Sequence, residues 1–181
     1  KLALTMNNGV TEIDASAATG NKLVIEGLMF KVEYVVFMVA IDGDGNASEQ
    51  MTRVDYTTPK PTFVKTTDTE SWNATAPDVE ITELAVNEDF PRFYKCKYTV
   101  TPKEGCKVFY SYLSSSNLTG VFDEQIKKIM TTGVKSTEAY TGGSNFSTLP
   151  STLYLTWVDK DGKFYEAKKV VIAAPDPEAG N

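Results

Sequence analysis

Two stretches of the chain repeat one pattern: an apolar strand, an Asp-x-Asp-Gly turn and a second strand. The first runs from Val39 to Glu49 and the second from Thr156 to Glu166, 117 residues further on. Both aspartates, the glycine and the final glutamate fall at matching positions. Because Asp-Gly supplies the positive φ angle that a tight turn needs, each stretch is predicted to be a β-hairpin. Two such hairpins predict two homologous domains.

The rest of the chain is dominated by the apolar alternation that is typical of strands. It recurs at residues 22–26, 93–100, 108–113, 153–158 and 170–172. One segment differs, because apolar residues between Phe122 and Met130 share one face at helical spacing and Gly133 provides a stop. The sequence therefore predicts an all-β fold with one short helix inserted in the second domain.

Proline and threonine mark a boundary between the two domains. The stretch 59–77 contains three prolines and little apolar periodicity, which predicts a semi-rigid linker. The first domain lacks counterparts of the first strands of the second. Either those strands lie upstream of Lys1, or something else completes a half-sandwich. The predicted division is a first domain, a linker, a second domain and a tail, at residues 1–58, 59–77, 78–175 and 176–181.

The segment from Gly27 to Tyr34, followed by the strand and turn to Glu49, resembles the fibronectin type III signature. Leu28 lies six residues before Tyr34, as the family leucine lies before the corner tyrosine that opens the penultimate strand. In the second copy Tyr154 follows Leu149 by five residues, so it need not be a corner tyrosine. The resemblance implies two tandem fibronectin type III-like or immunoglobulin-like β-sandwiches, the first incomplete in this chain.

Tandem domains with such turns and Thr-Thr-Pro linkers look like those in secreted or lipid-anchored surface proteins of gut-dwelling Gram-negative anaerobes. The resemblance implies a bacterial cell-surface lipoprotein. Its location would be extracellular or at the cell surface, anchored to the outer membrane by a lipid upstream of Lys1.

The net charge, the lack of histidine and the short apolar runs argue against several partners and mechanisms. A net charge of −6 argues against nucleic acid or an anionic membrane surface, because both require a basic face. The chain has no histidine, which excludes serine–histidine triads, histidine-assisted cysteine nucleophiles and the usual zinc sites. The longest apolar run, Tyr34 to Ile41, is too short to span a membrane. We therefore expect no enzyme activity, no catalytic residue, no cofactor and no membrane span.

The turn from Asp42 to Asn46 offers alternating oxygen ligands, as a calcium loop would. An EF-hand would need glycine and glutamate where this chain has Ala47 and Arg53. The second copy carries lysines beside its aspartates, which would repel a cation. We therefore expect two hairpin turns and no metal site.

The strand from Tyr34 to Ile41 breaks the alternation of a strand with one solvated face. In the family pattern Tyr34 and every second residue after it face the core. The outward set is large and apolar, and such a patch normally marks an interaction surface. We expect it to be covered by the second domain, by an upstream segment or by another chain. The alternative is that an extra strand, or the loop from Thr11 to Gly20, folds over it. The outward set consists of Val35, Phe37, Val39 and Ile41.

The tryptophans and cysteines leave further alternatives open. Trp157 alternates with leucines and is expected in the core. Trp72 lies in the predicted linker, either as a plug between the sandwiches or as a sugar-stacking ring, and it joins the candidate interaction surface. Cys96 and Cys106 are either a disulfide or two buried thiols, and their separation along the strands favours thiols.

The sequence favours a non-enzymatic extracellular or cell-surface module for adhesion, protein binding or spacing. The alternative is a glycan-binding accessory module of a polysaccharide-uptake or degradation system. A hydrolase is least favoured, because acidic pairs such as Glu88–Asp89 are expected to be solvated surface groups.

Overall fold

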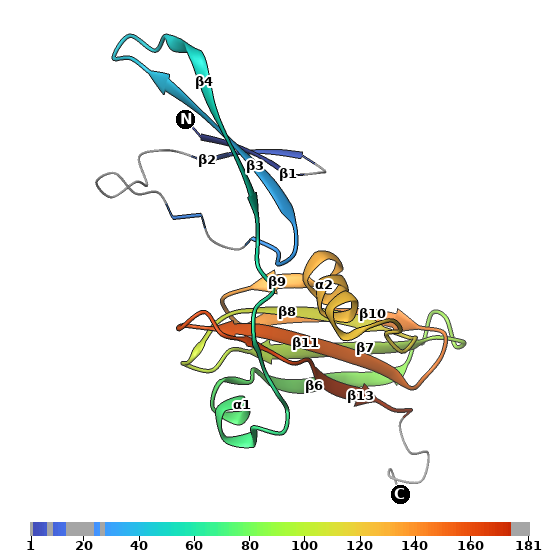
Figure 1. Ribbon diagram of the computed structural model, residues 1–181. Helices are drawn as coiled ribbons and strands as arrows, with labels where there is room; N and C mark the ends of the chain where they lie inside the picture. Colours follow the sequence, from blue (N-terminus) through green and yellow to red (C-terminus); the bar gives the residue numbers. More distant parts are fainter. Residues whose placement is uncertain (1, 7–8, 14–23, 26–27, 175–181) are drawn as a thin grey trace, which may run out of the picture. The chain divides into compact units, whose positions relative to one another are not determined.

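The computed structural model describes residues 2–6, 9–13, 24–25 and 28–174. The chain divides into two compact units, Lys1–Lys60 and Pro61–Asn181. Every strand pair in the described residues lies within one unit (Figure 1). None of the helices in this part of the chain is long and apolar enough to cross a membrane.

Unit 1 contains one antiparallel sheet of four strands in the order β2-β1-β3-β4. Val24 and Ile25 lie outside any strand, so the strand predicted at residues 22–26 is wrong at these two positions, and its other residues lie outside the described part. The Tyr34 hydroxyl accepts a hydrogen bond (2.8 Å) from the Met29 backbone N–H five residues upstream. This contact is that of a corner tyrosine, as the resemblance implies. The strands are β1 (Leu2–Met6), β2 (Gly9–Ile13), β3 (Glu33–Ile41) and β4 (Ala47–Thr57).

Unit 2 is built from two sheets. A three-stranded sheet has the order β10-β7-β6, and a six-stranded sheet has the order β5-β12-β11-β8-β9, with β13 also paired to β11. Between β8 and β9 the chain forms a helix, α2 (Phe122–Thr132), as the sequence predicts. The strands are β5 (Phe63–Val64), β6 (Asp78–Val86), β7 (Tyr94–Thr101), β8 (Cys106–Ser114), β9 (Val134–Ser136), β10 (Tyr140–Phe146), β11 (Ser151–Asp159), β12 (Phe164–Tyr165) and β13 (Lys168–Ile172).

The core of unit 2 lies between the inner faces of these two sheets. Tyr98 and Val100 from β7 are buried together with Phe109 from β8 and Trp157 from β11. Trp157 alternates along β11 with the buried Leu153 and Leu155, which confirms its predicted core position. Side chains from both sheets interdigitate in one cluster, so unit 2 is a β-sandwich.

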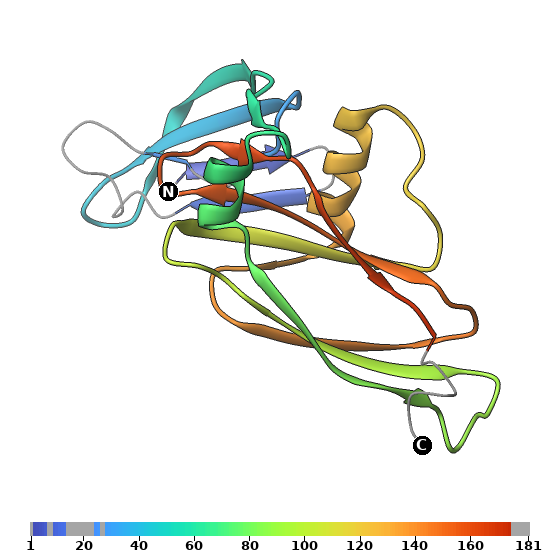
Figure 2. The ribbon, with the colours of Figure 1, turned by 90° about the horizontal axis from the view of Figure 1, so that it is seen from below.

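The outer face of the six-stranded sheet is covered by α2, which packs against β8 and β11 (Figure 2). The helix buries Ile126, Ile129 and Met130, three of the residues that share its predicted apolar face. Tyr154, on the outer face of β11, accepts a hydrogen bond from the Leu118 N–H rather than from a near neighbour. Its hydroxyl therefore fixes the segment before α2, and Tyr154 is not a corner tyrosine.

The two Asp-x-Asp-Gly turns share one hydrogen-bond pattern. In the first, Asp42 Oδ1 accepts from the N–H groups of Asp44 (3.0 Å) and Asn46 (2.8 Å). In the second, Asp159 Oδ1 accepts from those of Asp161 (2.9 Å) and Lys163 (2.8 Å). Both turns have a glycine with positive φ, at +86° and +80°. The aspartates therefore serve their own turns, as the hairpin prediction requires.

The surroundings of the two turns differ. Asp42 is exposed, and its second oxygen accepts from the Asn46 side chain. Asp159 is buried, and its second oxygen accepts a hydrogen bond (2.9 Å) from the Tyr165 hydroxyl. The second turn is thereby tied to the core of a sandwich, whereas the first stands on a single sheet.

Most of the segment predicted as a linker belongs to unit 2. From Pro61 onward it forms β5, which pairs in parallel with β12, and a helix, α1 (Thr69–Thr75). Ala76 and Pro77 are buried. The sequence pattern predicts a linker because threonine and proline disfavour regular structure. Contacts with the sandwich nevertheless stabilise β5 and α1 in this segment.

Those contacts centre on Trp72 in α1. Its ring packs edge-on against Trp157, with centroids 5.1 Å apart, and Trp157 stacks on Tyr165 at 4.9 Å. The Trp157 indole N–H donates to the Thr75 hydroxyl (2.9 Å), so α1 also satisfies a buried donor. Trp72 therefore packs against the core of its own unit and holds α1 there.

Cys96 and Cys106 are free, buried thiols. Cys96 lies on β7 and Cys106 begins β8, so they occupy different sheets. Burial raises the pKa of both thiols, that of Cys106 to about 11.

Replacing Trp72 by alanine should lower the free energy of unfolding of unit 2 by about 2–4 kcal/mol, because a large ring is lost against Trp157. Guanidinium denaturation of the full chain, followed by tryptophan fluorescence, measures the change, since both tryptophans lie in unit 2. Val134→Ala, which truncates a partly exposed side chain on β9, is the control and should cost about 0.5 kcal/mol or less. Equal effects from both variants would contradict the role assigned to Trp72.

The two thiols should react slowly with a disulfide reagent such as DTNB while the protein is folded. With a pKa of about 11, Cys106 at pH 8 is thiolate in only about one molecule in a thousand. Absorbance at the reagent's wavelength should show little release until guanidinium unfolds the chain, when both cysteines react. Rapid reaction of the native protein would contradict the buried positions.

Candidate functional site

The predicted interaction surface on β3 is less exposed than expected. Val35, Phe37 and Val39 are half-buried, and only Ile41, at 43% exposure, is an exposed large apolar residue. This surface stays a prediction, since half-buried side chains are available to a partner only in part.

The opposite face of β3 does not behave as a core face along its whole length. Tyr34 is buried, but Met38 is 39% exposed and Ala40 is exposed. The predicted burial of these two side chains is wrong, because the described residues of unit 1 form one sheet and supply no second sheet to cover this face.

The structure places Trp72 in unit 2 and the four β3 residues in unit 1. Trp72 is half-buried against Trp157, and its indole N–H lies 3.4 Å from the carbonyl oxygen of Glu166, to which it donates. The greater part of this ring is used in packing, which leaves little of its face for a ligand.

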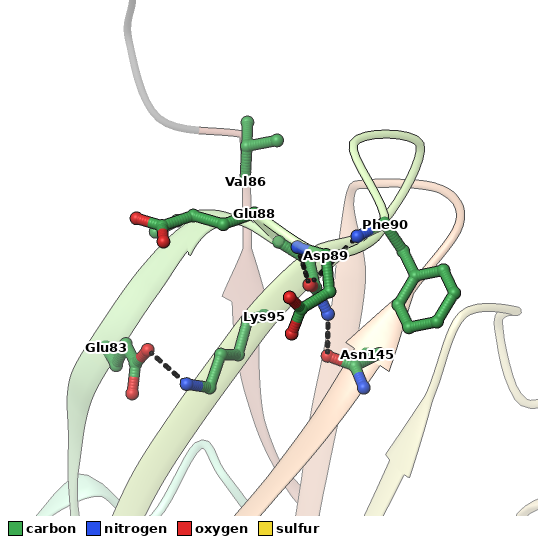
Figure 3. Close-up of a pocket in the computed structure, with 9 residues that line it drawn as sticks. Glu83, Val86, Glu88, Asp89, Phe90, Lys95 and Asn145 are labelled. Atoms are coloured by element: carbon green, nitrogen blue, oxygen red, sulfur yellow. Dashed lines mark hydrogen bonds and ion pairs between the residues drawn. The ribbon is translucent and has the colours of Figure 1, made fainter.

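A hollow lies on unit 2, where the loop 87–93 connects β6 and β7. It has a volume of about 490 Å³ and opens between this loop and the end of β10 (Figure 3). Its lining is rich in oxygen atoms from carboxylates and amides. The lining residues are Glu83, Ala85, Val86, Asn87, Glu88, Asp89, Phe90, Lys95 and Asn145.

Asn87 organises the loop from its first position. Its side-chain oxygen accepts hydrogen bonds from the N–H groups of Asp89 (3.0 Å) and Phe90 (3.2 Å), which makes an Asx turn. Its amide nitrogen donates to Asn145 Oδ1 on β10 (3.2 Å), and its backbone N–H donates to the Phe93 carbonyl (2.8 Å). The loop is therefore closed on itself and attached to the neighbouring strand.

The floor of the hollow carries an ion-pair cluster. The Glu83 carboxylate lies 3.1 Å from Lys95 Nζ and 2.7 Å from Lys97 Nζ. Hydrogen bonds from Lys97 and then Lys95 hold the pKa of Glu83 below its ordinary value of 4.5. The two lysines fix Glu83 in its ionised form at neutral pH.

Phe90 lines the hollow, and Phe93 lies beside it in the same loop. Phe90 is 62% exposed, and its ring meets that of Phe93 edge-on, with centroids 6.4 Å apart. Pro91 and Arg92 join them in a smaller, adjoining hollow of about 210 Å³. Exposed aromatic rings beside oxygen-rich side chains offer a ligand both an apolar face and hydrogen-bond acceptors.

Sequence reasoning singled out Glu88 and Asp89 only as solvated surface groups and missed the loop around them. The available signal is the run Phe90-Pro-Arg-Phe93 in a turn, where exposed aromatics are unusual. Asn145 lies 58 residues from Asn87, so its part in the site is visible only in the fold. No cluster of three or more potential metal ligands occurs in the described residues.

Comparisons with known proteins give little support beyond this geometry. No family model matches the chain, and no curated protein matches it. The chain is similar to one solved structure, described as fibronectin(III)-like modules of Clostridium thermocellum CbhA, at 13% sequence identity and with a TM-score of 0.23. The match covers 96% of this chain and 76% of the other. Because that score is low, the fold assignment rests on the strand order and the shared core of unit 2.

Replacing Lys97 by methionine should raise the pKa of Glu83 toward its ordinary value, and more than Lys95→Met does, because the Lys97 hydrogen bond contributes most. Carbon-13 NMR titration of the Glu83 carboxyl carbon measures both. The lowered pKa stabilises the fold above pH 4.5, and this contribution disappears as the pH falls through the folded-state pKa. An unchanged titration in both variants would contradict the cluster.

Proposed function

We propose that the chain is a non-enzymatic interaction module displayed at the cell surface or outside the cell, and that the β6–β7 loop contacts its ligand. The observation that carries the proposal is Phe90, a large apolar side chain that is 62% exposed at the rim of an oxygen-lined hollow. Exposing such a ring to water is unfavourable, and its burial by a ligand would be stabilising.

The chemistry of the hollow supports binding rather than turnover. A general acid needs a raised pKa, but the pKa of Glu83 is lowered by the two lysines beside it. The chain also contains no histidine to activate a nucleophile. These groups are arranged to accept hydrogen bonds, which suits recognition.

The surface location is supported by the resemblance of the tandem domains, with their Asp-x-Asp-Gly turns and Thr-Thr-Pro linker, to those in secreted or lipid-anchored bacterial surface proteins. A purely spacing role is the simplest alternative, because a β-sandwich can separate other domains without binding anything. An exposed aromatic rim has no part in spacing, which favours the binding role.

Glycan binding is the second candidate, and the lining of the hollow favours it. Carboxylate and amide oxygens can accept hydrogen bonds from sugar hydroxyls, while the Phe90 ring can pack on the apolar face of a pyranose. The excess of carboxylates in the lining, with Lys95 already paired to Glu83, favours a neutral glycan over an acidic one.

Binding of the full chain to a glycan array, and to immobilised mucin before and after enzymatic removal of its glycans, tests the proposal. We expect Phe90→Ala to weaken the observed binding at least about tenfold, as loss of an aromatic anchor does. Val134→Ala on β9, in the other sheet, should leave it unchanged.

Binding that survives removal of the glycans identifies a protein ligand, and binding that disappears identifies a glycan. Equal binding by Phe90→Ala and the parent protein would exclude the loop as the contact. An absence of binding on both surfaces would favour the spacer.

A further inference from the structure

The strand β4 presents an open edge in unit 1. It comes last in the order β2-β1-β3-β4, and no strand in the described residues pairs with its other side. All eleven residues from Ala47 to Thr57 are exposed. The strand contains neither proline nor lysine, residues that commonly block an edge. Its free N–H and C=O groups can therefore pair with another strand.

The register with β3 shows which residues face this edge. Glu33 pairs with Thr57, and the Thr58 N–H donates to the Val32 carbonyl (3.0 Å). Because hydrogen-bonded and non-hydrogen-bonded pairs alternate in an antiparallel ladder, the even-numbered residues of β4 from Thr52 to Tyr56 bond to β3. The odd-numbered residues direct their backbone groups to the open edge, and these are Met51, Arg53, Asp55 and Thr57.

We propose that this edge pairs with β4 of a second copy of the chain, antiparallel, about a two-fold axis at Val54. In that register Arg53 lies opposite Asp55 of the second copy, and the symmetry repeats the pair. The two side chains already attract each other within one strand, where Arg53 Nη2 lies 2.8 Å from Asp55 Oδ1. Pairing places opposite charges across the edge twice, which is self-complementary.

The other face of the strand carries two apolar side chains close to the axis in the same register. Val54, 44% exposed, meets its own symmetry mate, and Tyr56, 51% exposed, lies opposite Thr52 of the second copy. Pairs of β-branched and aromatic side chains stabilise neighbouring strands. Both faces of the edge are thus matched to a copy of themselves.

Neighbouring registers are less favourable. An axis at Arg53 places two arginines opposite each other, and an axis at Thr52 places Asp55 opposite Glu49. An axis at Met51 places Arg53 opposite Glu49 of the second copy, so charge alone allows this register. Charge-reversal variants and disulfide capture distinguish it from the axis at Val54. One paired strand makes a small interface, so the dimer should depend on concentration.

Analytical ultracentrifugation of the full chain over a concentration series tests the proposal. Arg53→Asp and Asp55→Arg each turn two attractive pairs into two repulsive ones and should weaken dimerisation at least about tenfold. An equimolar mixture of these two variants should restore it, because opposite charges then face each other. The double variant Arg53→Asp/Asp55→Arg should dimerise like the parent.

Disulfide capture tests the axis directly. Val54→Cys places two thiols opposite each other in a non-hydrogen-bonded pair, where Cα atoms lie about 4.5 Å apart, within range of a disulfide. Oxidation should give a covalent dimer on non-reducing gels, and the native cysteines are buried and do not compete. Glu49→Cys, which is also exposed but lies away from the axis, should not cross-link.

A parent protein that remains monomeric up to about millimolar concentration would overturn the proposal. Circular dichroism of each variant checks that the fold is retained. A dimer that is lost in the double variant would also overturn it, since the axis at Met51 then brings the introduced aspartate opposite Glu49 and repels it. This inference is independent of the proposed function, because unit 2 and Phe90 take no part in it.

Discussion

The packing of Trp157 is the contact on which the rest of unit 2 depends. Its fully buried indole lies between the two sheets, stacks on Tyr165 of β12 and meets Trp72 of α1 edge-on. Its N–H donates to Thr75, so a helix of only seven residues is attached to the core by a ring contact and a hydrogen bond. The Tyr165 hydroxyl in turn donates a hydrogen bond to the buried Asp159, which holds its turn against the core. One aromatic cluster thereby joins the inner sheet faces, a short helix and a hairpin.

Unit 1 shows what the same hairpin becomes when no sandwich surrounds it in the described residues. The turn at Asp42 keeps the hydrogen bonds of the turn at Asp159, because they are local to five residues. Of the strands that flank it, β3 is buried only at Tyr34 and half-buried over much of its length, and β4 is exposed along its whole length. Apolar side chains such as Val54 and Tyr56 therefore stay exposed to solvent, and the unpaired edge of β4 can pair with another strand.

The two units offer different kinds of surface. Unit 2 presents a closed loop with an aromatic rim over carboxylates and amides, which suits a ligand with both apolar and hydrogen-bonding groups. Unit 1 presents backbone and a self-complementary charge pair, which suits another strand. A dimer formed through β4 would carry two β6–β7 loops in one assembly, and two weak sites acting together bind a repetitive surface more tightly than one.

The sequence by itself determined the features that depend on near neighbours. Asp-Gly spacing predicted both turns, two-residue alternation predicted β7, β8 and β11 with Trp157 inside, and helical spacing predicted α2. The tertiary structure alone decided that residues 61–77 join unit 2, because α1 is too short to be stable without Trp157. It also decided that Met38 is exposed and that Asn87 meets Asn145 beside Phe90. Such outcomes depend on which distant segments cover a face or reach a loop, and local patterns carry no information about that.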